Sequence, residues 1–189
     1  MADTRKQVTD PKALRALAHP LRWKLLEVVS REGTATATQC AQETGESVAS
    51  CSYHLNMLAK YDFVEQAEGG QGREKPWRLV HPSQEMSNVG VEGESALAMQ
   101  AASGAFLDYA LTQIRERQLA THLEPDEWRA AVGIDNSNDY LTPAEVTELR
   151  EAFSERLNQF RERRARPELR PEGSRPVNFF LSATVAPTD

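Results

Sequence analysis

The stretch SCSYHLNMLAKYDFVEQAEGGQGREKPWR, residues 50–78, changes its hydrophobic periodicity halfway along. Its first half follows Ser47, a favourable helix N-cap, and places apolar residues on one helical face: Cys51, Leu55 and Leu58. Residues 63–68 then alternate in polarity as a strand does, the sequence GGQG supplies a turn, and residues 75–80 form a return strand. The stretch therefore predicts a helix followed directly by a β-hairpin.

Three shorter helices are expected before this stretch. Residues 11–18 begin with a proline, which is favoured in the first turn of a helix, and a second helix begins at Pro20 and ends at Gly33. Residues 34–44 form a third helix, which Gly45 closes as a C-cap. A short helix, a glycine turn and a second helix make the helix-turn-helix pattern, and the hairpin adds the wing of a winged helix. We therefore expect a mainly α fold with a small β component.

The second half of the chain is expected to be helical with some β structure. A long helix is predicted over residues 94–122, and strands are predicted over residues 127–134 and 177–185. Between the two strands, Thr142 and Glu145 form a capping box that opens an amphipathic helix. This pattern predicts a helical α+β region.

Charge is distributed unevenly between the predicted parts of the chain. We expect a winged helix-turn-helix domain over residues 1–82, a linker over 83–93, and a dimerisation and effector region over 94–189. Residues 1–82 hold 11 basic and 10 acidic residues, whereas residues 83–189 hold 11 and 18, which gives the net charge of -6. All the lysines lie in the first part. A polyanionic partner would therefore bind the first domain.

The sequence shows neither a targeting signal nor a membrane-spanning segment. No apolar run approaches the roughly 20 residues that a membrane helix needs, and residues 1–20 lack the apolar centre of a signal peptide. We expect a cytoplasmic protein that does not bind membranes.

Catalytic and metal-binding motifs are not found in the sequence. Its two cysteines, Cys40 and Cys51, lack metal-ligand spacing, and both fall on apolar helix faces, so we expect core packing rather than redox or metal sensing. No phosphate-binding loop, dinucleotide-binding motif or nucleophile–base signature is recognised. We therefore expect no enzyme activity, no cofactor and no bound metal.

The outer face of the helix in residues 50–60 suggests a nucleic-acid contact. Small and polar side chains lie opposite its apolar face, and an α-helix fits the major groove of DNA, where asparagine pairs well with adenine. Cations on the hairpin could neutralise phosphates or enter the minor groove; solubilising the hairpin is the alternative. The predicted DNA-contacting residues are Thr36, Thr38, Ser47, Val48, Ala49, Ser50, Ser52, Tyr53, Asn56, Lys60, Arg73 and Lys75.

Residues 11–81 resemble the ArsR/SmtB-type winged-helix transcription regulators. The resemblance rests on the helix entry ALAHPLRWKLL, residues 16–26, on the pattern S-x-H-L-x-x-L that begins at Ser52, and on the following wing. It implies a homodimeric, sequence-specific regulator of double-stranded DNA, often a repressor that a small effector releases.

The sequence departs from this family at its metal sites. Metal sensors carry a Cys-x-Cys motif on the third helix, whereas the matching positions here are Thr36 and Thr38. Asp108 and His122 lack the companion ligands of the second known site. The resemblance therefore supports DNA binding and argues against metal sensing at these sites.

The region after residue 94 is expected to form the dimer interface. One hypothesis is that it also encloses a small apolar or aromatic effector between Phe106, Trp128, Phe153, Phe179 and Phe180. Trp23 lies off the apolar face of its helix and is expected to pack against the C-terminal helices, with a ligand platform as the alternative. Two further hypotheses are a ligand-independent regulator that acts through a partner protein and a winged helix that contacts only proteins. The second of these predicts no salt-dependent binding to duplex DNA.

Overall fold

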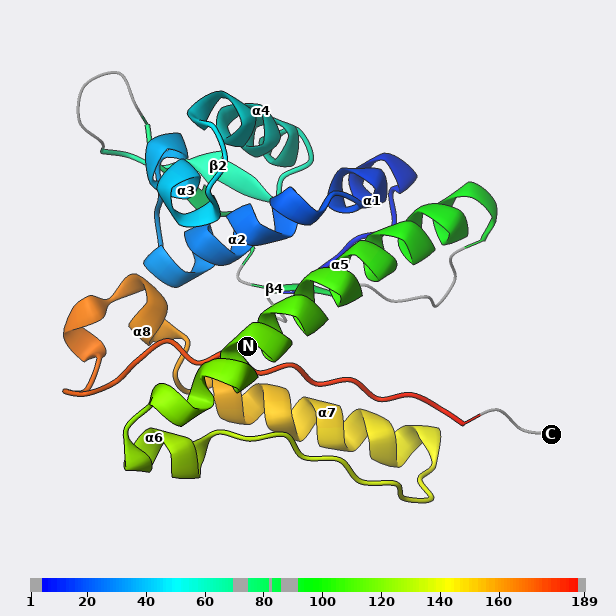
Figure 1. Ribbon diagram of the computed structural model, residues 1–189. Coiled ribbons are helices and arrows are strands. Elements are labelled where there is room, and N and C mark those ends of the chain that lie inside the picture. The colour runs from blue at the N-terminus through cyan, green and yellow to red at the C-terminus, as the bar shows by residue number, and fades with distance from the viewer. Residues whose placement is uncertain (1–4, 70–74, 82, 86–91, 187–189) are drawn as a thin grey trace. The chain divides into compact units, whose positions relative to one another are not determined.

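The computed structural model describes residues 5–69, 75–81, 83–85 and 92–186 of the chain (Figure 1). The chain divides into two compact units, Met1–Arg115 and Glu116–Asp189. The first unit therefore extends beyond the predicted winged helix and includes most of the long helix that follows it.

The first two helices begin and end at the residues that their capping signals predict. Helix α1, Pro11–Leu17, follows Asp10, whose carboxylate accepts hydrogen bonds from the backbone amides of its first turn at 3.1 and 3.3 Å. Helix α2, Pro20–Glu32, ends at Gly33, which has a φ of +79°. Both helices begin with proline, which lacks the N–H that the first turn of a helix leaves unpaired.

Helices α3 and α4 form the helix-turn-helix. Helix α3, Ala37–Thr44, ends at Gly45, which adopts the left-handed conformation with a φ of +73° and donates its N–H to the carbonyl of Ala41. Helix α4, Val48–Ala59, begins after Ser47, whose hydroxyl caps it. The glycine turn brings α3 and α4 together in the predicted order.

The hairpin after α4 is the predicted wing. Strand β2, Val64–Gln66, pairs in antiparallel register with strand β3, Trp77–Leu79, and Ala35 forms an isolated bridge to Trp77. Each strand is three residues long and thus shorter than predicted. Of the two cations predicted on the wing, Lys75 is described and exposed, and Arg73 lies outside the described residues.

One hydrophobic core holds the first unit together. Its fully buried side chains come from α1 to α4, from the wing, and from α5, Gly93–Ala120; they include Leu14, Leu17, Leu25, Val29, Cys40, Cys51, Leu55, Leu58, Phe63 and Met99. Both cysteines are free and fully buried, which confirms the expected packing role.

Helix α5 packs on α2 through an aromatic contact. The ring centroids of Trp23 and Phe106 lie 4.7 Å apart at an interplanar angle of 50°. The small residues Ala98 and Ala102 are also buried on this side of α5, which allows the helices to approach closely. This contact confirms that Trp23 packs against a helix of the C-terminal half.

A second small sheet was not predicted. Strand β1, Arg5–Gln7, pairs in parallel with β4, Ser83–Glu85, which falls in the predicted linker. Both strands are short and polar, so neither shows the alternation that identifies a half-buried strand in a sequence.

The second unit contains helices where one strand was predicted. Residues Asp126–Ala131 form helix α6, so the strand predicted over 127–134 is wrong. Asp126 and Glu127 lie in the first turn, where negative charge interacts favourably with the helix dipole, and Arg129 pairs with Asp126 at 2.6 Å. These local interactions favour a helix, although the apolar residues alternate as they do in a strand.

The predicted capping box of the second unit is present. Helix α7, Pro143–Asn158, follows Thr142, whose hydroxyl accepts from the N–H of Glu145 while the Glu145 carboxylate accepts from the N–H of Thr142. The remaining short elements of the described second unit are η1, Thr121–Leu123, α8, Glu162–Ala165, and η2, Pro167–Leu169.

The strand predicted over residues 177–185 is also wrong. This segment is extended and runs along α7 (Figure 1), with the Phe153 and Phe179 rings in a T-shaped contact at 5.6 Å, but it is not assigned as a strand. Its β-branched and aromatic residues favour an extended backbone. A strand also needs a partner, and in the described residues this segment joins neither sheet.

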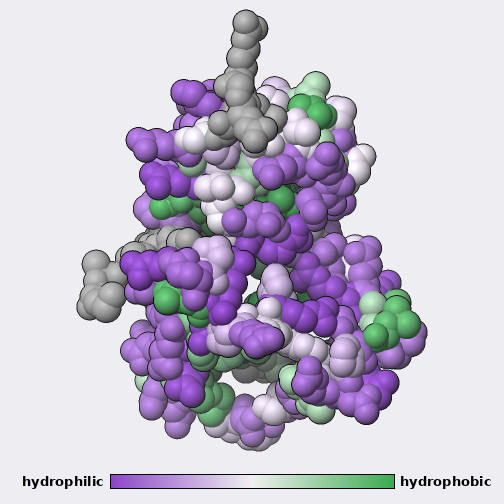
Figure 2. All heavy atoms as spheres, turned by 90° about the vertical axis from the view of Figure 1, so that its left-hand side faces the viewer, coloured by the Kyte–Doolittle hydropathy of each residue, from purple (hydrophilic) through white to green (hydrophobic). Residues whose placement is uncertain are grey.

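The protein is mainly helical with small β parts, as the sequence predicts: a winged helix-turn-helix precedes a helical C-terminal region. In the described ranges, none of the helices combines the length and apolarity that crossing a membrane requires. Figure 2 shows a face on which hydrophilic side chains predominate and apolar ones form small, separate groups.

Candidate nucleic-acid interface

Helix α4 separates its buried side chains cleanly from its exposed ones. Cys51, Leu55 and Leu58 are fully buried and anchor the helix in the core. On the opposite side, Tyr53 is 60% exposed and Val48 46% exposed, and the remaining predicted contacts of this helix are either exposed (Ala49, Asn56, Lys60) or half-buried (Ser50, Ser52). The helix contains no acidic residue. Its outer face is therefore free of negative charge and accessible.

Two of the predicted contact residues serve as helix caps. The Ser47 hydroxyl accepts a hydrogen bond from the N–H of Ser50 at 3.1 Å, and the Thr36 hydroxyl accepts one from the N–H of Gln39 at 3.2 Å. Both hydroxyls thus fix the starts of the two helices of the helix-turn-helix. Thr38, on the first turn of α3, is half-buried.

The amide of Asn56 has a partner on its own helix. Its Nδ2 donates to the carbonyl oxygen of Ser52 at 2.8 Å, and the side chain is exposed. A contact with adenine would require this exposed, weak hydrogen bond to be exchanged for one with the base.

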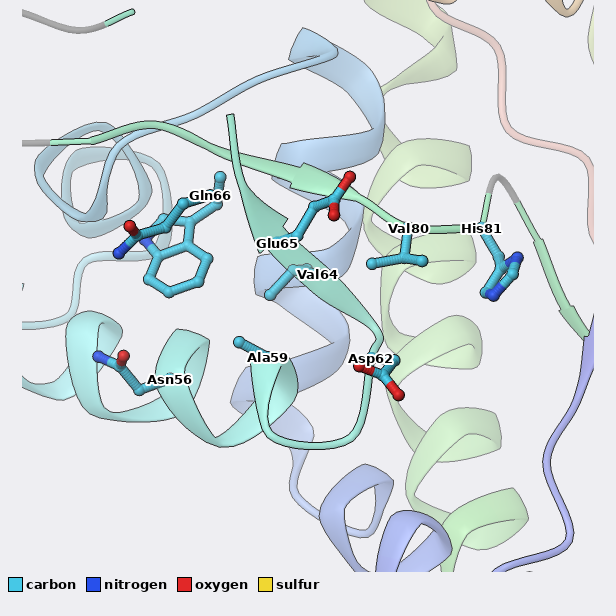
Figure 3. Close-up of a pocket in the computed structure, with 9 residues that line it drawn as sticks. Asn56, Ala59, Asp62, Val64, Glu65, Gln66, Val80 and His81 are labelled. Atoms are coloured by element: carbon cyan, nitrogen blue, oxygen red, sulfur yellow. The ribbon is translucent and has the colours of Figure 1, made fainter. Parts of the chain in front are cut away.

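A groove of about 600 Å³ lies between α4 and the wing (Figure 3). Asn56 and Ala59 line it from α4, and Glu65 and Gln66 line it from β2. Glu65 forms an ion pair of 2.8 Å with Arg78 on the neighbouring strand, which neutralises much of its charge. Asp62, also in the lining, has a φ of +57°, a conformation that aspartate tolerates better than most residues.

Two of the predicted cations lie close in sequence to elements that line this groove. Lys60 follows α4, with its Nζ 5.7 Å from the ring centroid of Tyr61, and Lys75 precedes β3.

Sequence reasoning missed a buried polar pair behind α4. The Nε of Arg22 donates to Nδ1 of His54 at 3.2 Å, and its Nη1 donates to the carbonyl oxygen of Ala16 at 2.5 Å. Both side chains are more than nine-tenths buried. The partner of His54 lies on α2, and no local sequence pattern joins residues so far apart in the chain.

The surroundings of His54 disfavour its protonation. Burial lowers the pKa of His54, and the charges of His19 and Arg22 lower it further. The His19 ring lies 4.4 Å from the His54 ring, and the Tyr53 ring makes a T-shaped contact at 5.2 Å. Because Nδ1 accepts from Arg22, the neutral ring carries its proton on Nε2. Neutral His54 thus ties α4 to α2 and, through Arg22, to α1.

The five aromatic residues of the hypothetical effector site are divided between the two units. Phe106 packs on Trp23 in the first unit. In the second unit, Phe153 contacts Phe179, and the Arg175 guanidinium lies 5.2 Å from the Trp128 ring centroid. Phe180 is half-buried. The effector site therefore stays a prediction.

The described residues contain no cluster of three or more His, Cys, Asp or Glu side chains that could hold a metal ion. The metal-sensor positions on α3 carry the hydroxyls of Thr36 and Thr38, of which the first is the helix cap described above.

Comparison with known proteins identifies the central part of the first unit. Residues 17–67 match the family model of a helix-turn-helix domain. This span runs from the end of α1 through α2, α3 and α4 to the end of β2. No match was found among curated proteins. Residues 17–67 therefore form a helix-turn-helix DNA-binding domain, which indicates a DNA-binding transcription regulator.

Proposed function

We propose that this protein is a sequence-specific transcription regulator, a dimeric repressor of the ArsR type that does not sense metals through the known sites. The observation that carries the proposal is the exposed outer face of α4, which is polar and free of acidic residues. This face has the dimensions and chemistry that suit the major groove, and Tyr53 and Asn56 are its best-placed hydrogen-bonding groups. Lys60 and Lys75 would contact phosphates, and Arg73, which lies outside the described residues, is proposed from the sequence as a third phosphate contact.

An apolar stripe on α5 supports self-association. Leu97, Gly104 and Leu111 recur at seven-residue spacing on the side of the helix opposite the core. Leu97 is 70% exposed, Leu111 56% and the neighbouring Leu107 42%. A Cβ added at Gly104 would meet no atom within 4 Å, so the middle of the stripe is open. A second α5 packed on this stripe would cover the leucines and relate two recognition helices by a two-fold axis.

The second unit gives further support to an assembly. Among its described residues none is buried, whereas many large apolar side chains are exposed, including Leu123, Ile134, Leu149, Phe160, Phe179 and Leu181. A unit without a core gains little free energy from folding alone. We therefore assign residues 94–189 to dimerisation, and the aromatic effector site stays a hypothesis within this region.

Selection of bound duplexes from a randomised pool, at two salt concentrations, tests this function. We expect recovery of an inverted repeat with half-sites about one helical turn apart, with weaker recovery at high salt because phosphate contacts release counterions. Enrichment of no sequence, both with purified protein and with cell extract added to supply an effector, would contradict the proposal. That outcome would favour a winged helix that contacts proteins only.

A further inference from the structure

A second pocket lies on the flank of α4, outside the proposed DNA face. It has a volume of about 370 Å³ and is lined by Lys12, Arg15, Ala16, Arg22, Met57 and Tyr61. Half of these residues are cations, supplied by α1 and α2, and none is acidic. Met57 and Tyr61 add apolar and aromatic surface. The lining thus combines positive charge with room for a group larger than a water molecule.

Arg22 is the residue that distinguishes this pocket from an ordinary basic surface. It is only 8% exposed, yet in the described part of the chain it forms no ion pair. Its Nε and Nη1 bind His54 and Ala16, which leaves Nη2 without a hydrogen-bond partner among the described residues. A buried guanidinium normally has an anionic partner, because burial of an uncompensated charge is costly.

Glu94 of α5 is an internal competitor at the edge of this pocket. The Arg15 guanidinium donates a hydrogen bond to the Glu94 carboxylate. This hydrogen bond and the charge of Arg15 lower the pKa of Glu94, and the charge of Lys12 lowers it further. Both partners of the pair are more than half exposed. An anion from solution could therefore replace the carboxylate on Arg15 without disturbing the core.

We propose that this pocket binds a small oxyanion of the phosphate class, held by Arg22, Arg15 and Lys12, and that Glu94 competes with it for Arg15. Arginine provides paired N–H donors that match phosphate oxygens, and the nearby lysine adds a point charge. The Tyr61 and Met57 wall would accept an apolar substituent, so phenyl phosphate is a suitable probe alongside inorganic phosphate. The pocket's anion binding does not depend on whether α4 contacts DNA.

Titration of the full chain with inorganic phosphate and with phenyl phosphate tests the proposal. Ionic strength is kept constant with chloride, and binding is followed by calorimetry and by amide chemical shifts. We expect saturable binding, with shifts at α1, α2 and Tyr61. The double variant Lys12→Met, Arg15→Met should bind phosphate about tenfold more weakly or worse, because charge-assisted hydrogen bonds are lost. Both positions are exposed, so the variant should fold, which circular dichroism checks.

Two further variants distinguish specific binding in this pocket from non-specific attraction of anions to surface cations. Glu94→Gln should tighten phosphate binding, because Arg15 loses its charged competitor. Lys24→Met removes an exposed cation of α2 outside the pocket lining and should leave the affinity unchanged. Absence of saturable binding in both the wild type and Glu94→Gln would overturn the proposal. Equal weakening by Lys24→Met and by the double variant would also overturn it.

A duplex of random sequence distinguishes the source of the phosphate group. If saturating inorganic phosphate displaces the duplex at constant ionic strength and the double variant binds the duplex more weakly, the pocket holds a phosphate of the DNA backbone. If phosphate binds while duplex affinity is the same for the wild type and the double variant, the pocket holds a free anion.

Discussion

At the scale of single residues, α4 depends on a hydrogen bond that requires a neutral histidine. His54 accepts from Arg22, and the rings of His19 and Tyr53 contact it; the negative charge of Glu46 acts in the opposite direction and raises its pKa. Protonation would remove the acceptor and place a second positive charge beside the guanidinium. The position of α4 is therefore coupled to the ionisation of one buried side chain.

The first prediction concerns pH. The pKa of His54 is lowered in the folded chain, so the unfolded chain, with its ordinary value of about 6.5, binds a proton first as pH falls. The free energy of unfolding should therefore decrease as pH falls below about 6.5. Denaturant titrations at several pH values should show that the free energy of unfolding of His54→Gln depends less steeply on pH than that of the wild type. The exposed His122→Gln is the control and should follow the wild type; parallel curves for all three proteins would contradict the role given to His54.

The second prediction concerns the turn between α3 and α4. Gly45 has a φ of +73°, and a Cβ added there would meet no atom within 4 Å. Gly45→Ala should therefore lower the free energy of unfolding only through backbone strain, by about 1–2 kcal/mol. Gly45→Asn should cost less, because asparagine adopts this conformation more readily. Chemical denaturation measures both, and equal stability of Gly45→Ala and the wild type would mean that the turn tolerates a different backbone conformation.

At the scale of elements, the sequence predicts best those features that local interactions determine. The starts of α1 and α4 and the ends of α2 and α3 coincide with Asp10, Ser47, Gly33 and Gly45, because a cap acts within a few residues of its own position. The start of α3 was predicted at residue 34, but the helix begins at Ala37, after the cap Thr36. Helix α6 was missed although local interactions also determine it. The acidic residues of its first turn favour a helix, whereas the alternation of its apolar residues indicates a strand.

Features that need a distant partner were not predictable in this way. Strands β1 and β4 pair although the whole winged helix lies between them in the sequence, and neither has a strand pattern of its own. The outer face of α4 followed from helical geometry alone, whereas the Arg22–His54 pair and the cationic pocket arise where three helices meet. Helical periodicity specifies which side of an element is buried, but not which side chain it will meet there.

The third prediction concerns the stripe on α5. Leu107→Glu combined with Leu111→Glu should weaken the dimer by more than about tenfold, because each buried leucine contributes about 1.5–3 kcal/mol and occurs twice in a two-fold interface. Val48→Glu, an equally polar change at an exposed apolar residue outside residues 94–189, should leave association unchanged. Sedimentation equilibrium measures all three proteins. A wild type that is monomeric at micromolar concentration would contradict the dimer, and a double variant that still dimerises would place the interface elsewhere.

At the scale of the whole molecule, the buried core and most of the acidic surplus lie in different parts of the chain. The buried side chains of the described residues all belong to the first unit, which also contains the helix-turn-helix. The acidic surplus lies after residue 82. A net negative chain can therefore still offer an accessible cationic and polar surface to DNA, since exposed charges beyond about 10 Å are largely screened at ordinary salt.

The fourth prediction follows from this division. A fragment of residues 1–120, which keeps α5 complete, should unfold cooperatively on heating, because it contains the buried core. A fragment of residues 116–189 should show no cooperative transition as a monomer. Calorimetry of the two fragments checks both statements. Cooperative unfolding of the second fragment at concentrations where it is monomeric would show that this unit has a core of its own.

The central claim is that the outer face of α4 distinguishes DNA sequences, and its most direct test is the ratio of affinities for the selected duplex and a scrambled one. The test variant combines Tyr53→Phe, which keeps the ring beside His54, with Asn56→Ala. The ratio, measured by fluorescence anisotropy, should fall by about tenfold or more, while affinity for the scrambled duplex and its salt dependence stay unchanged. An unchanged ratio, or an equal loss of affinity for both duplexes, would contradict the assignment of α4 as the recognition helix.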